Sequence, residues 1–417
     1  MKDFHLTPAA LRLFDGSVPD MNTQTTTTAS LSAENKTFWD KALIVLAGPE
    51  LVHDQFGQQR DIPAGGGKTI EFRQFDPLPE ITAPLTEGVT PDGQSLSVSA
   101  ATATVAQYGG YVTTSDVLDM TALDPVVNEA TRLIARQAGE TLDSITRDTV
   151  NAGTNVLYAQ GSADSRPTSR AAVGYASAAS NNNLTVADVK LAVRTLKRQN
   201  APKIRGDYVA IIHPDVAFDL MRDPEWLTPK QYVDTRELYA GEIGKLYGVR
   251  FVENTRAMVF KGADLASDSR TLKINYASGY SGAITSVAFD GGTVAADALI
   301  GRKIMINGVT ATVTDNDASS ITFASTNFGA ISDDTVIYPG EGGAAGGAVY
   351  STLVIADDAY GVTKVAGGGL QHIVKPLGSG GTSDPLDQRS TIGWKALKAA
   401  KILVQQYLVR IESSATP

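Results

Sequence analysis

Residues 124–151 read DPVVNEATRLIARQAGETLDSITRDTVN, and this stretch predicts the longest helix of the chain. Asp124 is a favoured N-cap, and Pro125 is favoured at the first helical position. Apolar residues then recur every three or four positions, at Val127, Ala130, Ile134, Ala138, Leu142 and Ile145. The run corresponds to roughly 27 residues and about 40 Å. A helix this long with one narrow apolar face is expected to span a flat domain.

Two stretches of alternating residues, 68–75 and 97–106, precede this helix. The segment between them is interrupted by Pro77, Pro79, Pro84, Gly88, Pro91 and Gly93, which no regular element tolerates. The pattern predicts a long two-stranded hairpin with a wide, proline-rich tip. Such a hairpin buries too little surface to be stable alone in water, so it needs a partner. No partner is obvious within the chain.

The first 30 residues are polar and irregular, and they predict an arm without a core. A helix is expected over residues 32–47. Residues 184–222 predict two more helices flanking a buried strand at 208–212, with Thr185 capping the amide of Asp188 and Leu184 packing on Val189. Residues 241–254 predict a glycine turn followed by a strand.

Residues 277–348 show no helical period. Short alternating runs separated by Gly, Asn, Asp and Ser clusters predict a small all-β module, and the glycines of 340–347 predict a flexible exit linker. Residues 349–356 resume the buried-strand pattern of the main domain, which makes the module an insertion. Near the C-terminus lie two apolar-rich runs, 392–397 and 402–411; either helix or strand fits the first.

Composition excludes several classes of function. The 417-residue chain contains no cysteine, which removes disulfides, cysteine zinc sites, iron–sulfur clusters and thiol nucleophiles. Its formal charge of −9 argues against a strong grip on nucleic acid. The four histidines share no ligand spacing, and no stretch approaches the length of a membrane span. We therefore expect no metal and no cofactor.

Several short motifs imitate functional sites, and in each the structural interpretation is favoured. GGGKT at 65–69 resembles the end of a phosphate-binding loop, but a strand follows where a helix is required. Asp315 and Asp317 begin like a calcium loop that lacks its glycine and final glutamate, which favours a turn. Lys190, Arg194 and Lys197 form a basic stripe on a predicted helix. A solvated face is its simplest interpretation, and contact with DNA on an interior face is the alternative.

The order of these parts is more specific than any single motif. An arm, a helix, a proline-tipped hairpin, a very long helix, an α/β domain and a paired C-terminal segment resemble the major capsid proteins of tailed bacteriophages with the Hong Kong 97-type fold. More narrowly, the chain resembles the coat family typified by the N-four-like podophages. The resemblance covers about residues 22–260 and 349–412 and is carried by GYVTTSD at 110–116, GEIGKLYGVRFVE at 241–253, VYSTLV at 349–354, AYG at 359–361 and GWKA at 393–396.

The resemblance implies an α+β capsid fold with a small all-β insertion domain. It divides the chain into an N-terminal arm (1–60), an extended loop (61–115), a peripheral domain with the spine helix (116–160), an axial domain (161–276, continued at 349–374), the insertion (277–348) and a C-terminal peripheral segment (375–417). For the C-terminal segment, it favours strands over helices.

The resemblance also implies a function. The chain would be a non-enzymatic major capsid protein that forms hexamers and pentamers of an icosahedral shell around double-stranded DNA. It would assemble in the bacterial cytoplasm, with portal and scaffolding or decoration proteins as further partners. The extended loop would lie over a neighbouring subunit, which supplies the missing partner of the hairpin. The apolar residues expected at that contact are Phe75, Leu78, Ile81, Leu85 and Val89.

Two other functions fit the residues. One is an acidic, cysteine-free enzyme with an inserted β domain. The other is a surface-binding protein whose β module recognises carbohydrate.

Overall fold

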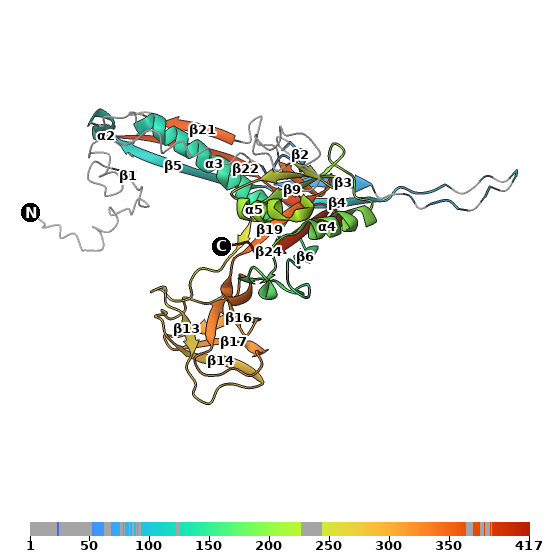
Figure 1. Ribbon diagram of the computed structural model, residues 1–417. Coiled ribbons are helices and arrows are strands. Elements are labelled where there is room, and N and C mark those ends of the chain that lie inside the picture. The colour runs from blue at the N-terminus through green and yellow to red at the C-terminus, as the bar shows by residue number, and fades with distance from the viewer. Residues whose placement is uncertain are drawn as a thin grey trace, which may run out of the picture.

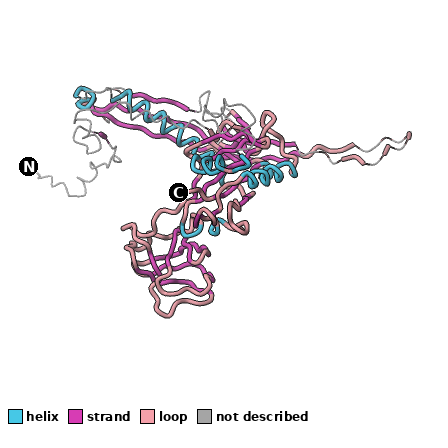
Figure 2. Tube along the Cα trace, in the orientation of Figure 1, coloured by secondary structure: helices cyan, strands magenta, loops and turns pink. Residues whose placement is uncertain are grey.

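The computed structural model describes residues 23–24, 52–61, 68–75, 78, 80–82, 84–85, 87–88, 90, 93–121, 126–226, 244–363, 370–375, 379, 384 and 386–417. Figure 1 shows a central body from which a long helix with its sheet, a thin hairpin and a small barrel extend in three directions. Figure 2 shows that strands and loops predominate and helices are few. The predicted helix over 32–47 lies outside the described residues.

A seven-stranded mixed sheet forms the centre of the body. Its strand order is β10-β11-β9-β19-β24-β6, with β12 also paired to β19. The strands are β6 (Val156–Tyr158), β9 (Tyr208–Ile212), β10 (Lys245–Leu246), β11 (Val249–Glu253), β12 (Val259–Phe260), β19 (Val349–Ile355) and β24 (Leu408–Ser413). All five residues of β9 are buried, as its apolar run predicts, because both faces of the sheet are covered.

Helices α4 (Val186–Arg198) and α5 (Pro214–Arg222) cover one face of this sheet. The predicted capping of α4 is confirmed: the hydroxyl of Thr185 accepts from the amide of Asp188 at 3.4 Å, and the Asp188 carboxylate accepts from the amide of Thr185 at 3.3 Å. Leu184 and Val189 share the same core cluster. His213 caps α5 by accepting from the amide of Asp215 at 3.2 Å. His213 therefore follows the buried strand and caps the second of the two predicted helices.

The long helix is α3 (Val126–Asn151), and it packs on a second sheet. The sheet order is β1-β5-β22-β21, from β1 (Thr23–Gln24), β5 (Ala106–Ser115), β22 (Arg389–Lys398) and β21 (Leu370–Lys375). Helix α2 (Asp116–Thr121) follows β5. Ile134, Ala138 and Leu142 of α3 contact Ile392 and Trp394 of β22, which confirms the predicted apolar face. The run at 392–397 is thus a strand. No described helix is long and apolar enough to cross a membrane.

The predicted hairpin is confirmed as β3 (Thr69–Phe75) and β4 (Val98–Thr104), paired from Thr69 opposite Thr104 to Phe75 opposite Val98. Its base meets a three-stranded sheet of β2 (Gln58–Arg60), β20 (Tyr360–Thr363) and β23 (Ala400–Ile402). Phe72 is buried there, and its ring lies directly over Gly361 of β20. The base of the hairpin is therefore part of the body, whereas the tip extends away from it (Figure 1).

The β module is a closed six-stranded barrel with its own core. The strand order is β13 (Leu272–Ile274), β14 (Ala283–Asp290), β17 (Ser320–Asn327), β16 (Val309–Asn316), β15 (Lys303–Ile306) and β18 (Val336–Pro339). The alternating pattern predicted within 277–348 is confirmed by β14 to β18, and β13 adds one strand before residue 277. The remaining described elements are β7 (Tyr175–Ser177), β8 (Ser180–Asn181) and the short 3-10 turns at Arg170–Ala172, Ala344–Gly346 and Gln405–Tyr407.

Three sequence-based expectations need correction. Residues 340–347 are a packed turn rather than a flexible linker: the amide of Ala344 donates to Val173 at 2.8 Å, and a Cβ on Gly343 would lie 2.1 Å from the Val173 carbonyl oxygen. The extended loop does not reach residue 115, because β5 pairs with β22 along its whole length. The C-terminal segment is divided, because β24 is a strand of the central sheet.

Two glycine substitutions test the packing of the hairpin base. A Cβ on Gly361 would lie 2.4 Å from the Phe72 ring, so Gly361→Ala is expected to lower the free energy of unfolding by about 1–3 kcal/mol. A Cβ on Gly139 in α3 would meet no neighbouring atom within 4 Å, so Gly139→Ala should raise that free energy by about 0.5–1 kcal/mol. Equilibrium unfolding in urea measures both. Equal effects of the two substitutions would contradict this packing.

Candidate inter-subunit surfaces

The tip of the hairpin exposes apolar side chains. Leu78, Ile81 and Leu85 are 50%, 74% and 74% exposed, and Leu96 and Val98 on the returning side are also exposed. Phe75 lies in β3 opposite Val98, and Val89 lies outside the described residues. Contiguous exposed apolar side chains on a soluble protein mark an interaction surface. Sequence reasoning misses Leu96 and Val98; the pairing register of the strands is the signal that places them on the same ribbon.

The same tip is acidic. Residues 76–97 contain four carboxylates, Asp76, Glu80, Glu87 and Asp92, and no lysine or arginine. Glu80 and Glu87 are exposed, beside the apolar side chains. A surface that receives this tip therefore has to offer apolar contact together with neutral or basic groups.

The base of the hairpin, in contrast, is fixed within the subunit. Ile70, Phe72 and Ala103 form a small core cluster with Ala399, which lies between β22 and β23. The hairpin thus combines a fixed base with a tip whose described apolar side chains are exposed.

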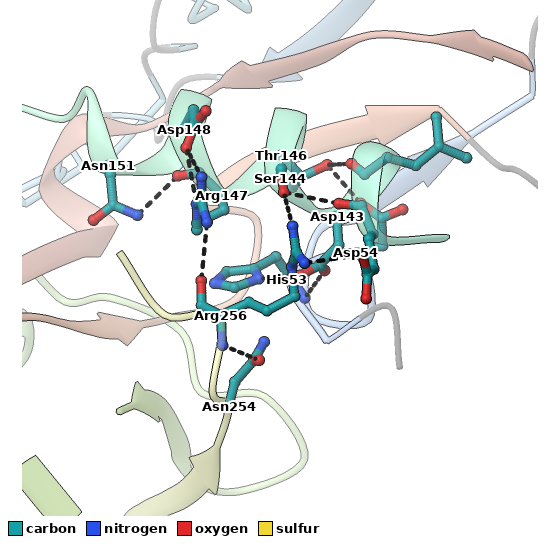
Figure 3. Close-up of polar contacts among 12 residues, drawn as sticks. His53, Asp54, Asp143, Ser144, Thr146, Arg147, Asp148, Asn151, Asn254 and Arg256 are labelled. Carbon is teal, nitrogen blue, oxygen red and sulfur yellow. Dashed lines mark hydrogen bonds and ion pairs between the residues drawn. The ribbon is translucent and has the colours of Figure 1, made fainter. Parts of the chain in front are cut away.

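A cluster of buried polar contacts, called here the polar junction, joins the segment before β2 to α3 and to the end of β22 (Figure 3). His53, in the segment before β2, is 1% exposed. Its amide donates to one carboxylate oxygen of Asp143 in α3 at 2.8 Å, and its ring Nδ1 lies 2.8 Å from the other. A bidentate contact of this kind fixes both the position and the orientation of the segment on the helix. The hydroxyl of Tyr360 in β20 donates to the carbonyl oxygen of His53, and burial raises the pKa of that hydroxyl.

The neighbouring residue completes the junction. One carboxylate oxygen of Asp54 accepts from the hydroxyl of Thr146 in α3 at 2.6 Å, and the other accepts from Lys398 Nζ at the end of β22, also at 2.6 Å. Asp54, Thr146 and Lys398 are all buried. A buried charge is tolerated only when it is paired and hydrogen-bonded, and both conditions are met here.

A second cluster of charged side chains lies beside β12, where the chain leaves the central sheet for the barrel. Arg170 donates to both carboxylate oxygens of Glu412, at 2.8 and 2.6 Å, and Arg410 Nε lies 2.9 Å from the same carboxylate. The guanidinium carbons of Arg170 and Arg410 lie 3.4 and 5.5 Å from the ring centroid of Phe260 in β12. Burial lowers the pKa of Arg410. Phe260, the last residue of β12 before the barrel, is thereby fixed to the central sheet.

The predicted basic stripe is one face of α4. Lys190 is paired with Glu225, and this hydrogen bond raises the pKa of Lys190 and lowers that of Glu225. Arg194 and Lys197 are exposed. The three side chains lie on one face of the helix, as their spacing predicts, and they line one groove. The interior position of this face stays a prediction.

The weaker motifs have the structural roles that their sequence context favours. Thr69 begins β3, so GGGKT ends at the base of the hairpin. Asp317 accepts from the amides of Ser319 and Ser320 at 2.7 and 2.6 Å, which is a turn, and these hydrogen bonds lower its pKa. Among the described residues, no group of histidine and acidic side chains could hold a metal ion.

Removing the buried cation tests the polar junction. Lys398→Met leaves Asp54 buried with only Thr146 as a partner, so we expect the free energy of unfolding to fall by about 3–5 kcal/mol. The double variant Asp54→Asn/Lys398→Met removes both charges and should recover part of that loss. Equilibrium unfolding of the four proteins of this cycle measures the coupling. A coupling near zero would show that the pair does not hold the junction.

Comparisons with known proteins agree with this architecture. A family model described as phage capsid protein matches residues 99–283. The capsid of Ralstonia phage GP4 matches with a TM-score of 0.54 and 10% identity, covering 94% of this chain and 99% of that chain. The capsid of cyanophage P-SCSP1u matches with 0.53 and 14%, covering 96% and 100%, and that of cyanophage Pam1 with 0.53 and 13%, covering 100% of both. No curated protein matches.

The structural matches establish the fold, which is shared over nearly the whole length of the chain. The family match covers most of β4, all of β5, α3, α4 and α5, and strands β6 and β9 to β12 of the central sheet. Together they confirm the α+β capsid fold that the sequence predicts. The chain has the Hong Kong 97-like fold of phage capsid proteins, and its residues 99–283 match the phage capsid protein family.

Proposed function

We propose that copies of this chain form hexameric and pentameric capsomers that close an icosahedral shell around double-stranded DNA. Assembly takes place in the cytoplasm of the host bacterium, and portal and scaffolding or decoration proteins are further partners. The observation that carries the proposal is the hairpin, whose base is built into the body while the described apolar side chains of its tip are exposed.

The geometry of the hairpin supports contact with another copy. Of the residues between Phe75 and Val98, those that the structure describes belong to no core cluster of the subunit. Figure 1 shows the tip projecting away from the body rather than folding back onto it. A two-stranded ribbon with exposed leucine and isoleucine gains stability only when another surface covers it.

We propose matching roles for the other parts. The α3 helix with β5, β21 and β22 forms the peripheral domain, and the central sheet with α4 and α5 forms the axial domain around the capsomer centre. The barrel is the insertion domain. These roles are structural and involve no reaction, which fits the mutual pairing of the buried charges at Asp54 and Glu412.

Deleting residues 77–94 tests the role of the hairpin. The tip contributes nothing to the described core clusters, so the deletion variant should remain folded and fail to assemble. Circular dichroism and thermal unfolding report folding, and negative-stain electron microscopy with sedimentation reports assembly.

A triple substitution gives a gentler form of the same test. Leu78→Ser/Ile81→Ser/Leu85→Ser should reduce assembly at least tenfold, because each serine removes exposed apolar surface that a neighbour would cover. The matched control, Thr82→Ser/Thr90→Ser, changes the same ribbon without removing large apolar side chains. Normal shells from the triple variant, or unfolding of the deletion variant, would contradict the proposal. A small monomer in the wild type would favour the surface-binding alternative.

The shell is expected to be held by noncovalent contacts. Some shells of this fold are cross-linked by isopeptide bonds that start from a lysine of the extended loop, but this chain has no lysine from residue 69 to residue 189 and no cysteine. Lys68 lies at the base of the hairpin, where its reach is poor. Particles boiled in detergent and reducing agent should release one band near 43.9 kDa. A ladder of covalent oligomers with Lys68 in a branched peptide would contradict this expectation.

A further inference from the structure

Positive charge is concentrated in one short segment of this acidic chain. Residues 190–205 contain no aspartate or glutamate and six cations, Lys190, Arg194, Lys197, Arg198, Lys203 and Arg205, although the formal charge of the chain is −9. The segment is most of α4 together with the loop that follows it. This segment is therefore positively charged, whereas the rest of the chain carries a net negative charge.

The structure gathers these cations around a groove. Lys190, Arg194, Lys197 and Arg198 line an open groove of about 470 Å³, together with Val193 and Tyr247. Lys203 extends the charged surface along the same edge, since its Nζ lies 4.0 Å from the position that a Cβ on Gly248 would occupy, next to Tyr247. Figure 1 places α4 on the central body, away from the barrel.

The cations differ in how they are compensated. Lys190 is paired with Glu225, which also accepts from the Tyr247 hydroxyl at 2.9 Å, and Lys190 Nζ lies 4.5 Å from the centre of the Tyr247 ring. These contacts fix the aromatic ring at the wall of the groove. Arg194, Lys197 and Arg198, by contrast, have no carboxylate within ion-pair distance in the part of the chain that the structure describes, and all three are exposed.

We propose that this groove binds the phosphate backbone of the enclosed double-stranded DNA, so that α4 faces the interior of the shell. The inference rests on the proposed function, because it assumes a shell that contains DNA. Lys190 and Lys197 are separated by about 10 Å along the helix axis, which spans about three phosphates of one strand at 3.4 Å each. Clustered, unpaired cations recognise a polyanion without reading its sequence.

The acidic hairpin tip of a second copy is the competing occupant. Its exposed side chains include Leu78, Ile81, Leu85 and Leu96, which require an apolar receiving surface. The groove offers only Tyr247 as an exposed apolar ring, because Val193 is buried. The barrel is an unsuitable surface for DNA, since residues 277–348 contain seven carboxylates and two cations. The observations therefore favour the nucleic acid.

Salt-dependent binding of the full-length, unassembled chain to a labelled 30-base-pair duplex tests the inference. Arg194→Gln/Lys197→Gln should make the slope of log K against log salt shallower by about 1.8, because each lost phosphate contact contributes about 0.9. The control Arg270→Gln/Lys303→Gln removes two exposed cations far from the groove, one just before β13 and one in β15 of the barrel, and its slope should equal that of the wild type. Binding is followed by fluorescence anisotropy between 50 and 200 mM salt, and assembly of each protein is scored by electron microscopy.

The two measurements separate this inference from the proposed function. A shallower slope in the groove variant alone supports the DNA contact. An unchanged slope with normal shells, or no salt-dependent binding by the wild type, overturns the inference and leaves the capsid function in place. An unchanged slope with loss of shells identifies the groove as a contact between copies and also overturns it. Failure of the wild type to form shells counts against the proposed function instead.

Discussion

The buried ion pair between Lys398 and Asp54 joins segments that are 344 residues apart in the chain. Lys398 ends β22, Asp54 precedes β2, and Thr146 of α3 donates to the same carboxylate. Because a buried charge that loses its partner is strongly destabilising, separating any of these three elements from the others is expected to cost several kcal/mol. The adjacent His53–Asp143 contact has the same effect on the helix. The long helix, its sheet and the base of the hairpin therefore behave as one unit.

This fixed junction explains how an isolated ribbon can serve in assembly. A hairpin that was flexible at its base would lose much entropy on reaching a neighbour. Here, Phe72 packs on Gly361 and the β2–β20–β23 sheet lies beside it, so the direction of the ribbon is set before assembly. Only the tip remains uncovered. Its apolar and acidic character then defines what kind of surface completes it.

Local signals in the sequence are sufficient for much of this architecture. The Thr185–Asp188 capping box, the apolar face of α3 and the alternating strands of the hairpin each depend on residues a few positions apart, and each is confirmed. The features that could not be predicted depend on distant partners. Nothing near Lys398 indicates that it is buried against Asp54. The glycines of 340–347 imitate a linker, but they are required by close packing on Val173. For the same reason, the exposed surfaces are only partly predictable: the sequence indicates Leu78 and Lys190, while Leu96 and Tyr247 join them only through strand pairing and folding.

The central claim is that a second copy of the chain covers the hairpin tip. A cryo-electron microscopy reconstruction of particles assembled from the purified chain tests it most directly, because it shows where residues 76–97 lie relative to each subunit. The account predicts continuous density for the ribbon against a neighbouring subunit, with Leu78, Ile81 and Leu85 covered. A ribbon that lies free in solvent, or that folds back onto its own body, would contradict the account.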